Sequence, residues 1–575
     1  MTAPHTLLDT AGPKNHFGPA WHRRVAGLHV LKLKGSFYDM GVQHGTLLRE
    51  DVARGPIPHF RTHVERLMGR STLGPAGKLV WPVLQSLVGR RAAKKLPSFA
   101  VDSLRGIAEG AQLDPNEFLD GCTMPDSLLW LASRLMQVKK IGPAVHHRLA
   151  LGLGCTSAIA WGDATRDGML LHARNLDYHG VGTWPSTAAV IFYEPEDGMK
   201  YVAAAAAGVA LGGFTAMNEA GLSLTVHQHM FTDRARLGGT PIGLAGDLVM
   251  RHARNLDDAE RILSDFTPIG CWTYLVTDAK TREVLCWEEN PERHVARRTT
   301  PSETTFGYAN IYLDPALGET ELNLYGSYWR HNQGRFRRVH EMLAERAGTL
   351  DPQSMAEIIG DRGDPRCRIR DAMAMVMTVA SVVFRPEDGT MWLGTGQAPT
   401  SRSTYIPFSL HNQDIAPPAR ELRVGDDESD SDRAGYEAYR KAYVAYLEDD
   451  DPRAARALMA DACDHCPEQP LFHFLHALAA LQLGEAADAD RALTRSIRLG
   501  HPDEQRVAAF HLWRGRARDM LDQRDVARRD YRSALGHAAD PPVHRAAQAH
   551  LDRAFHPRGL RTMNIDFSLA DVVTP

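Results

Sequence analysis

The chain has 575 residues, too many for one ordinary domain, and this length predicts two or three domains. Hydrophobic residues make up 43% and charged residues 24% of the chain, a balance that excludes a disordered or fibrous protein. The 66 basic and 70 acidic residues leave a formal charge of -4, so no global field favours nucleic acid or an anionic membrane. Seven cysteines are too few for a disulfide framework.

The sequence shows neither a targeting signal nor a membrane span. Its first 18 residues lack a basic segment followed by an apolar one. The longest uncharged stretch, residues 201–218, is rich in Ala and Gly and falls short of the roughly 20 strongly apolar residues that a span needs. We therefore expect a cytoplasmic protein without a membrane or nucleic-acid partner.

Residues 1–154 are predicted to be mostly helical, for example over 100–111 and 126–136. Between Gly35 and Gly45 the pattern indicates the end of a strand that turns into a helix at the glycines.

From residue 155 to 411, short apolar runs alternate with turn signals. Three β-hairpins are predicted, over residues 157–173, 272–287 and 379–393. Helices are predicted between them, over 244–266 and 332–346. The region is therefore expected to be α+β with mostly antiparallel strands.

The rest of the chain divides into three parts. Residues 412–434 are polar and acidic, which predicts a solvated linker. Residues 435–556 are predicted to be all-α and weakly self-similar, with a spacing close to the 34 residues of tetratricopeptide repeats. Such repeats bind protein partners or pack on neighbouring domains, and they perform no chemistry. In the tail, residues 557–575, the run Met563 to Phe567 is apolar enough to dock on the preceding domains.

Most motifs that carry chemistry are absent from the sequence. It has no P-loop, no His-Glu-x-x-His and no Gly-x-Ser-x-Gly. Cys463 and Cys466 form a Cys-x-x-Cys without a second matching pair, which favours a structural role over zinc. His227 and His229 share one face of a predicted strand, but no carboxylate or cysteine accompanies them. We therefore predict neither a metal nor another cofactor.

Three Gly-Cys pairs occur, and one has an unusual context. Cys155 begins a predicted hairpin whose return strand ends in Arg174 and Asp177, so the hairpin places both charged residues beside the thiol. Cys271 begins a similar hairpin, but its return strand ends in two glutamates without an arginine. Cys122 falls among helices. We expect the last two cysteines to be buried and inert.

The segment Gly154-Cys155-Thr156-Ser157, followed by Asp167-Gly168 and Arg174-Asn175-Leu176-Asp177, resembles the autoproteolytic cysteine family typified by isopenicillin N acyltransferase. That family is related to choloylglycine hydrolases and acid ceramidase-type amidases, all of them N-terminal nucleophile hydrolases. The resemblance covers about residues 30–410. Further matches lie at 35–45, 217–222, 308–310, 327–335 and 378–382, and the helical repeats lie outside it.

The resemblance implies that the chain is a zymogen that cuts itself before Cys155. The thiol would attack the Gly154 carbonyl, form a thioester, and be released by water as a new N-terminus, so that residues 1–154 are a pro-segment. Gly154 has no Cβ, which permits the strained turn that such an attack needs. The freed α-amine, with a reference pKa of about 7.7–8.0, would act as the general base.

The resemblance also implies roles for three further residues. Arg174 would orient the nucleophile and favour the thiolate. Asp177 would accept a hydrogen bond from the new α-ammonium group. Asn310 would donate to the tetrahedral oxyanion.

A later arginine is expected to complete the site. Arg368 is our choice, and Arg330 is the rival. The bile-salt branch of the family has a second oxyanion asparagine, which aligns near His227 and Gln228. That difference leaves the second donor open and argues against a bile-salt hydrolase.

The resemblance implies a four-layer αββα sandwich, built from the N-terminal segment and residues 155–411, with a C-terminal all-α helical-repeat domain. The activity would be hydrolysis of a linear amide, or transfer of the acyl group to an amine, through a Cys155 thioester. The alternative is a non-catalytic scaffold that acts through its repeats. Because a linker precedes the repeats, we also expect a chain ending near Asn412 to fold and to cleave itself.

Overall fold

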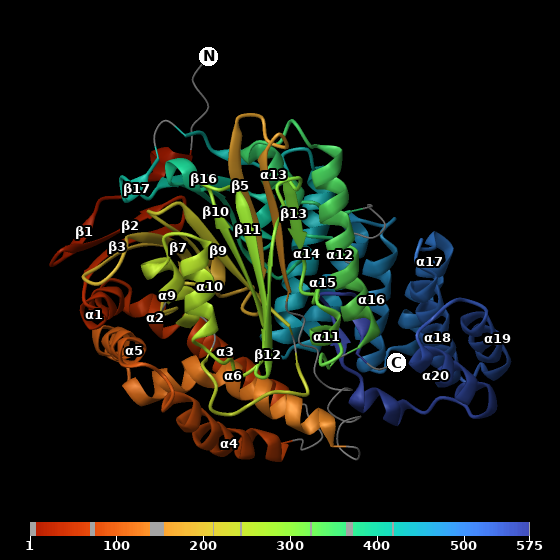
Figure 1. Ribbon diagram of the computed structural model, residues 1–575. Coiled ribbons are helices and arrows are strands. Elements are labelled where there is room, and N and C mark those ends of the chain that lie inside the picture. Colours follow the sequence, from red (N-terminus) through yellow and green to blue (C-terminus); the bar gives the residue numbers. More distant parts are fainter. Residues whose placement is uncertain are drawn as a thin grey trace.

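In the computed structural model, two β-sheets lie face to face and helices cover their outer sides (Figure 1). The structure describes residues 7–69, 75–138, 154–210, 212–229, 231–241, 244–322, 325–363, 372–416 and 419–573. Within these residues, neighbouring strands of both sheets are antiparallel except for one parallel pair, β3 with β6.

The first sheet has ten strands within the described residues. In spatial order they are β1 (Asn15–Phe17), β2 (Ala20–Val25), β3 (Leu28–Gly35), β6 (Ala188–Pro195), β7 (Tyr201–Ala206), β8 (Thr215–Asn218), β9 (Leu222–Gln228), β10 (Trp272–Asp278), β11 (Glu283–Asn290) and β12 (Arg293–Arg298). The strands β1 to β3 fall in the region that the sequence predicts to be mostly helical.

The second sheet contains the predicted nucleophile. Its order is β13 (Thr305–Tyr308), β4 (Gly154–Gly162), β5 (Gly168–Asp177), β14 (Thr378–Arg385), β15 (Thr390–Gly394) and β16 (Thr404–Ser409), with β17 (Asp414–Ile415) and β18 (Leu422–Arg423) both paired to β16. The three predicted hairpins are confirmed as β4–β5, β10–β11 and β14–β15.

Two apolar clusters fill the space between the sheets, because alternate residues of each strand point inward. In one of them Phe192 of β6 packs with Phe384 of β14 and Phe408 of β16. In the other, Ile159 of β4 packs with Leu275 of β10.

Helices close the sandwich from outside. The helices α1 (Phe37–Leu47) and α5 (Ser98–Ala111) pack on the first sheet, and α12 (Gly326–Glu345) and α13 (Pro352–Ile359) pack on the second. Further helices of the first half are α3 (Pro56–Gly69), α4 (Pro75–Ala93) and α6 (Pro115–Gln137). The structure thus has the four layers that the resemblance implies.

Glycines explain the very close crossing of α1 and α5. A Cβ on Gly45 would lie 2.1 Å from the carbonyl oxygen of Ile107, and one on Gly106 would lie 2.4 Å from that of Tyr38. Any larger residue would force these helices apart. The match at residues 35–45 therefore has a packing reason.

The C-terminal part is helical, as predicted. Successive helices pack against one another: α14 (Asp430–Leu447), α15 (Pro452–His465), α16 (Pro470–Gln482), α17 (Ala486–Leu499), α18 (Glu504–Met520), α19 (Arg524–Leu535) and α20 (Pro541–Asp552). Ser429, Asp451 and Asp503 cap three of these helices through their side chains. That these pairs are tetratricopeptide repeats with a protein partner stays a prediction.

Two local predictions differ from the structure. The segment predicted as an acidic linker is partly built into the fold, because β17 and β18 pair with β16 and the Glu428 carboxylate binds Arg402 at 3.1 Å. The helix predicted over 244–266 is two helices, α9 (Leu244–His252) and α10 (Leu256–Ser264). Asn255 interrupts it with an extended backbone and caps α10 with its side chain.

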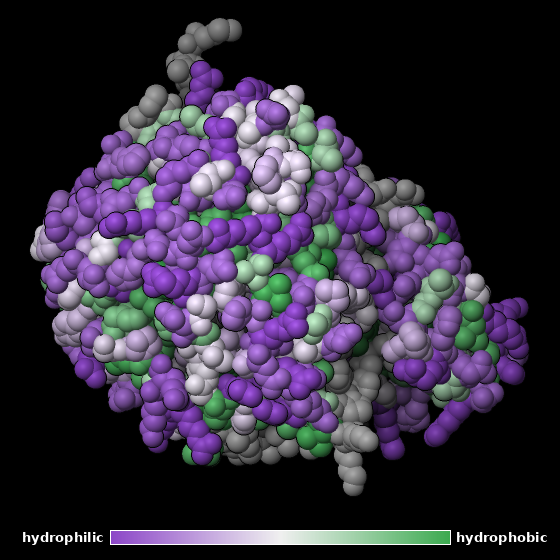
Figure 2. All heavy atoms as spheres, viewed as in Figure 1, coloured by the Kyte–Doolittle hydropathy of each residue, from purple (hydrophilic) through white to green (hydrophobic). Residues whose placement is uncertain are grey.

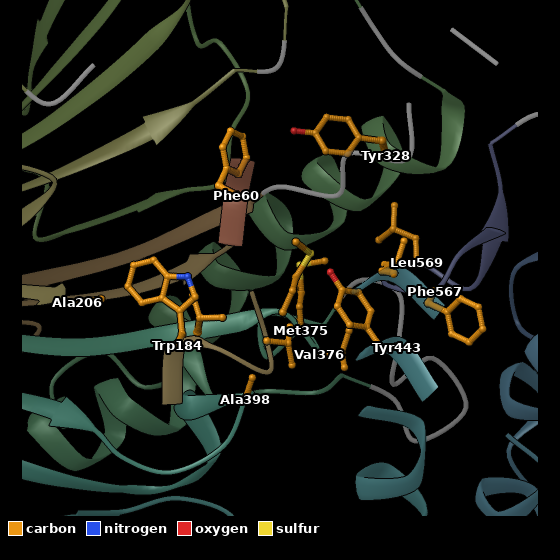
Figure 3. Packing of buried hydrophobic residues seen from close by; sticks show 14 of the residues in the cluster. Phe60, Trp184, Ala206, Tyr328, Met375, Val376, Ala398, Tyr443, Phe567 and Leu569 are labelled. Atoms are coloured by element: carbon orange, nitrogen blue, oxygen red, sulfur yellow. The ribbon is translucent and has the colours of Figure 1, made fainter. Parts of the chain in front are cut away.

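The C-terminal tail forms a short hairpin of β19 (Ile565–Asp566) and β20 (Asp571–Val572). Its Phe567 and Leu569 are buried in one cluster with Tyr443 of α14 and with sandwich residues such as Met375 (Figure 3). The tail, the helical domain and the sandwich therefore share a hydrophobic core. This arrangement favours the opposite outcome for a chain ending near Asn412, because that truncation would expose the shared core.

Hydrophilic residues predominate on the face shown in Figure 2, and hydrophobic residues are scattered among them. None of the described helices combines the length and the apolar character that a membrane crossing needs.

Candidate active site

The β4–β5 hairpin determines how the predicted site is built. Its register pairs Gly154 with Asp177, Cys155 with Leu176 and Ser157 with Arg174. Directly opposed residues share a face of the sheet. Cys155 and Arg174 therefore face the other sheet, whereas Asp177 and Thr156 belong to the face that α12 covers.

The Cys155 thiol lies beside Arg174, as the hairpin predicts. Nη2 of Arg174 donates to Sγ at 3.2 Å and to the Val226 carbonyl at 3.0 Å, and Nη1 donates to the Thr215 hydroxyl at 2.5 Å. Cys155 and Arg174 are 4% and 1% exposed. Burial raises the pKa of the Cys155 thiol, and the two nearby guanidinium groups offset part of this rise. The sulfur is therefore a thiol at neutral pH.

A second arginine, Arg335 of α12, binds Cys155 from the other face of the sheet. Its Nη1 donates to the Cys155 carbonyl at 2.8 Å and to the Thr156 hydroxyl at 2.9 Å. Its Nη2 donates to Oδ1 of Asn310 at 3.1 Å and to Oδ1 of Asn332 at 2.7 Å. The side chain is fully buried, so these hydrogen bonds fix one position of the guanidinium group.

Asp177 lies at the end of β5, next to the predicted cleavage point. Thr378 donates to its Oδ1 at 2.5 Å. Its Oδ2 is buried and has no hydrogen-bond partner among the described residues, and the nearest Arg335 nitrogen is 3.9 Å away. A Cβ on Gly154 would lie 2.9 Å from this oxygen. Burial raises the pKa of Asp177, against the effect of Arg335.

Asn310 binds the nitrogen of the predicted scissile peptide. Its Oδ1 accepts from the Cys155 N–H at 2.6 Å, and its Nδ2 donates to the Gln228 carbonyl at 2.7 Å. The backbone of Asn310 is left-handed, with φ 48°, a conformation that asparagine tolerates better than most residues. Since Nδ2 carries two hydrogens, one of them is still available for an oxyanion.

The structure does not bring Arg330 to the site. Arg330 forms an ion pair with Asp540 instead. Arg330 and Arg335 are five positions apart on α12, so their side chains point about 140° apart. Arg368 lies outside the described residues.

Arg335 lies in the matching run 327–335, but the sequence alone indicates no role for it. The sequence feature that could have identified Arg335 is helical spacing. It shares the inward face of α12 with other buried residues, namely Tyr328, His331, Asn332 and Val339. An arginine on such a face needs several hydrogen-bond partners.

His227 and Gln228 are neighbours in the sequence but lie in different surroundings. Nε2 of His227 lies 3.0 Å from the Ser157 hydroxyl, in the polar interior between the sheets, and burial holds the pKa of His227 well below its usual range. Gln228 lines the cavity beside Cys155 and supplies the carbonyl that Asn310 binds. Of these two residues, only Gln228 borders the space that a substrate would occupy.

A cavity of about 190 Å³ opens next to Cys155. Gly154, Arg174, Asp177 and Thr215 border it on the side of Cys155. Most of the other lining side chains are apolar, among them Ile57, Phe60, Leu96, Leu104, Tyr178, Trp184, Val209, Phe214, Val226, Leu244 and Trp272. The space beside the thiol therefore suits an apolar group.

The other two cysteines that follow a glycine have no comparable surroundings. Cys122 of α6 also lines the cavity, but burial raises its pKa to about 12. Cys271 is fully buried, and its thiol donates to the His229 carbonyl at 3.3 Å. Within the described residues, no group of three or more His, Cys, Asp and Glu side chains has an arrangement that could hold a metal ion.

Comparisons with known proteins agree with part of this assignment. Residues 164–399 match the model of the acyl-coenzyme A:6-aminopenicillanic acid acyl-transferase family. The matched range begins after Cys155 and includes Arg174, Asp177, Asn310 and Arg335. This match supports acyltransferase chemistry in general.

Two individual proteins are also similar to the chain. An uncharacterized protein of Archaeoglobus fulgidus is 26% identical over 270 residues, which are 45% of this chain and 42% of that protein. The chain thus spans less than half the length of this relative. The solved structure of a Caenorhabditis elegans N-acylethanolamine-hydrolyzing acid amidase ortholog is 18% identical, with a TM-score of 0.27, and the alignment covers 40% of this chain and 93% of that chain.

Proposed function

We propose that the chain is a self-cleaving cysteine enzyme that hydrolyses linear amides, or transfers their acyl group to an amine, through a thioester on Cys155. The observation that carries this proposal is the Arg174 guanidinium group on the Cys155 thiol at the edge of an apolar cavity. Burying a guanidinium group costs free energy. A buried arginine that donates to a thiol therefore indicates a catalytic role for that thiol.

Self-cleavage uses the groups around the Gly154–Cys155 peptide. Sγ attacks the Gly154 carbonyl carbon, the C–N bond breaks, and the Cys155 nitrogen takes up the thiol proton. Asn310 holds this nitrogen through its N–H, so the leaving group is oriented before the reaction. Water then hydrolyses the thioester, which leaves a carboxylate on Gly154 and a free thiol on Cys155.

The freed α-amine finds two acceptors at its position. Oδ1 of Asn310 already accepts one N–H, and Oδ2 of Asp177 is buried beside Gly154 without a hydrogen-bond partner among the described residues. An ammonium group at this point would satisfy the Asp177 carboxylate. The amine, in its neutral form, accepts the proton of its own thiol when Sγ attacks a substrate carbonyl.

The cavity indicates the part of the substrate that lies beside Cys155. Because most of its lining is apolar, we assign it to the acyl group of the amide, with the amine leaving toward solvent. Each additional methylene buried there contributes about 0.8 kcal/mol, or roughly fourfold in kcat/KM, until the cavity is full. Water and an amine compete for the same thioester, so both hydrolysis and transfer follow from one intermediate.

Anilides of increasing acyl chain length test this function. Purified wild-type protein should release the aniline, carry an acyl adduct on the peptide that begins with Cys155, and form an acyl hydroxamate when hydroxylamine is added. Cys155→Ala, incubated with the same anilides, should do none of these. Equal turnover by both proteins, or no adduct with any anilide, would refute the proposed function and leave the scaffold alternative.

A further inference from the structure

Three carboxylates from the C-terminal part of the chain surround the first turn of α12. The contacts are Tyr325 to Asp566, Ser327 to Oδ2 of Asp571 at 2.5 Å, and Arg330 to Asp540. The amino end of a helix carries partial positive charge, which favours anions at this position. Two of the three aspartates belong to the tail hairpin, so the tail contributes directly to the position of α12.

The helical domain binds the same hairpin through hydrogen bonds from α14 and α18. Arg506 of α18 donates to the carbonyls of Leu569 and Ala570, and Nη1 of Arg506 lies 3.5 Å from Asp571. Tyr439 of α14 donates to the Phe567 carbonyl at 2.6 Å. The tail therefore bridges the helical domain to α12 (Figure 3).

The bridged helix carries the groups that bind the nucleophile. Arg335 lies eight residues after Ser327, about 12 Å along the helix axis. Farther along α12, Val339 and Leu343 pack on β4 and α13 and anchor the second half of the helix. The tail holds the other half, and Arg335 lies between the two anchored parts. Its four hydrogen bonds leave little room for a shift of the axis.

We propose that residues 563–573 are a strap that positions α12, and through it Arg335, at Cys155. The inference rests on the function proposed for Cys155. Tyr325 and Ser327 are then positioning residues, because they act on the site only through the helix. No residue of α12 is among those that line the described cavity, so loosening the strap should slow the reaction without weakening substrate binding.

The full-length double variant Tyr325→Phe, Ser327→Ala tests the strap because it removes both donors and leaves the apolar contacts of the tail. Tyr531→Phe is the matched control, since Tyr531 of α19 also donates to a buried aspartate, Asp519 of α18, at 2.7 Å, and neither residue belongs to α12 or to the tail hairpin. We expect self-cleavage and kcat to fall at least tenfold in the double variant with KM within twofold of wild type. The control should retain wild-type rates at a similar loss of thermal stability. Ser327→Thr, which keeps a hydroxyl group, should restore the rate relative to Ser327→Ala.

Hydrogen exchange gives a readout that does not depend on activity. In the double variant the amides of residues 326–335 should exchange faster, while those of 336–345 keep their protection. Rates and exchange equal to those of the control variant would overturn the strap. A wild-type protein that neither cuts itself nor turns over an anilide would instead refute the proposed function, and the exchange data would still decide whether the tail positions α12.

Discussion

Two hairpins of this chain begin with the same pair of residues, glycine followed by cysteine. The first is β4–β5 with Cys155, and the second is β10–β11, directly preceded by Cys271. Both thiols are buried, at 4% and 0% exposure, and in both burial raises the pKa of the cysteine. In sequence and in local structure, the two hairpins are therefore close analogues.

The surroundings of the two thiols differ in the charge of the neighbouring side chains and in whether a cavity adjoins the thiol. Two arginines adjoin Cys155 and oppose the rise of its pKa, whereas Glu321 raises the pKa of Cys271 further. Cys155 borders a cavity, while Cys271 packs in a small cluster with Tyr312 and Leu317. The comparison shows that the first hairpin places both the thiol and one cation, Arg174, whereas segments far away in the sequence supply the second cation, Arg335, and most of the cavity wall.

The largest difference between the hairpins should appear when each cysteine is removed. We expect Cys155→Ala to remain uncut and to lose turnover by more than about a thousandfold, because the nucleophile is gone. Cys271→Ala should be processed and stay within threefold of wild-type turnover once folding is checked by thermal melting. Turnover in Cys155→Ala at the level of Cys271→Ala would remove the distinction between the hairpins.

The arginines provide the next test. Arg335→Lys keeps the charge but cannot make four hydrogen bonds in the same geometry, so we expect self-cleavage and kcat to fall by about a hundredfold. Arg297→Lys is the control beside the second hairpin, because Arg297 of β12 lies opposite Cys286 of β11 and forms a half-exposed ion pair with Glu303 at 3.0 Å. It should change neither rate by more than twofold, as stopped assays of both variants would show.

The return strands of the two hairpins end in buried carboxylates, Asp177 and Glu289. We expect both to affect stability, but only Asp177 to affect activity. Burial raises the pKa of Asp177, and it raises that of Glu289 to about 8. A raised pKa means that the folded state favours the protonated form, so stability is greatest at low pH and is lost as the pH rises through the folded pKa.

An amide side chain does not ionise, so replacing either carboxylate by its amide removes this loss of stability at high pH. We therefore expect Glu289→Gln to melt at a higher temperature than wild type at pH 8 to 9, with little difference at pH 4. Asp177→Asn should have the same effect in the uncut Cys155→Ala background, where no α-ammonium group pairs with the carboxylate. Only Asp177→Asn should also slow self-cleavage and turnover, by at least tenfold, because the α-ammonium group loses its charged partner. Melting curves across this pH range, together with rates, test both parts. A Glu289→Gln protein with the same loss of rate would contradict the assignment of Asp177.

The smallest effect is expected for Cys122, the other thiol of the cavity. Its pKa of about 12 keeps it protonated, so Cys122→Ala should be processed normally and keep kcat. The slightly larger cavity should change KM by no more than about threefold, with longer acyl chains gaining most. A loss of self-cleavage in Cys122→Ala would give this second thiol a role that the account does not include.

The sequence predicts best what short-range geometry determines. The Asp167-Gly168 turn sets the register of β4 and β5, and this register alone brings Arg174 and Asp177 to Cys155. The apolar run from Met563 to Phe567 likewise predicts that the tail docks.

Two features that the sequence did not predict, the role of Arg335 and the packing of the acidic segment, depend on contacts between residues far apart in the chain. The spacing of buried residues places Arg335 on the inward face of α12, but its contact with Cys155 depends on how this helix packs on the second sheet, which no local pattern encodes. The acidic segment around Glu428 is packed rather than solvated because Arg362 and Arg402 reach it from elsewhere in the chain. Both cases involve arginines whose partners lie far away in the sequence.

The central claim is that Cys155 becomes the N-terminus of a second chain by its own reaction. Intact mass of freshly purified wild-type protein, measured beside Cys155→Ala, tests it most directly. The account predicts two species for wild type, residues 1–154 and 155–575, which stay together under native conditions because β1 to β3 and the rest of the first sheet come from both. The variant should show one uncut chain. A wild-type preparation that turns over amide as a single uncut chain would contradict the account.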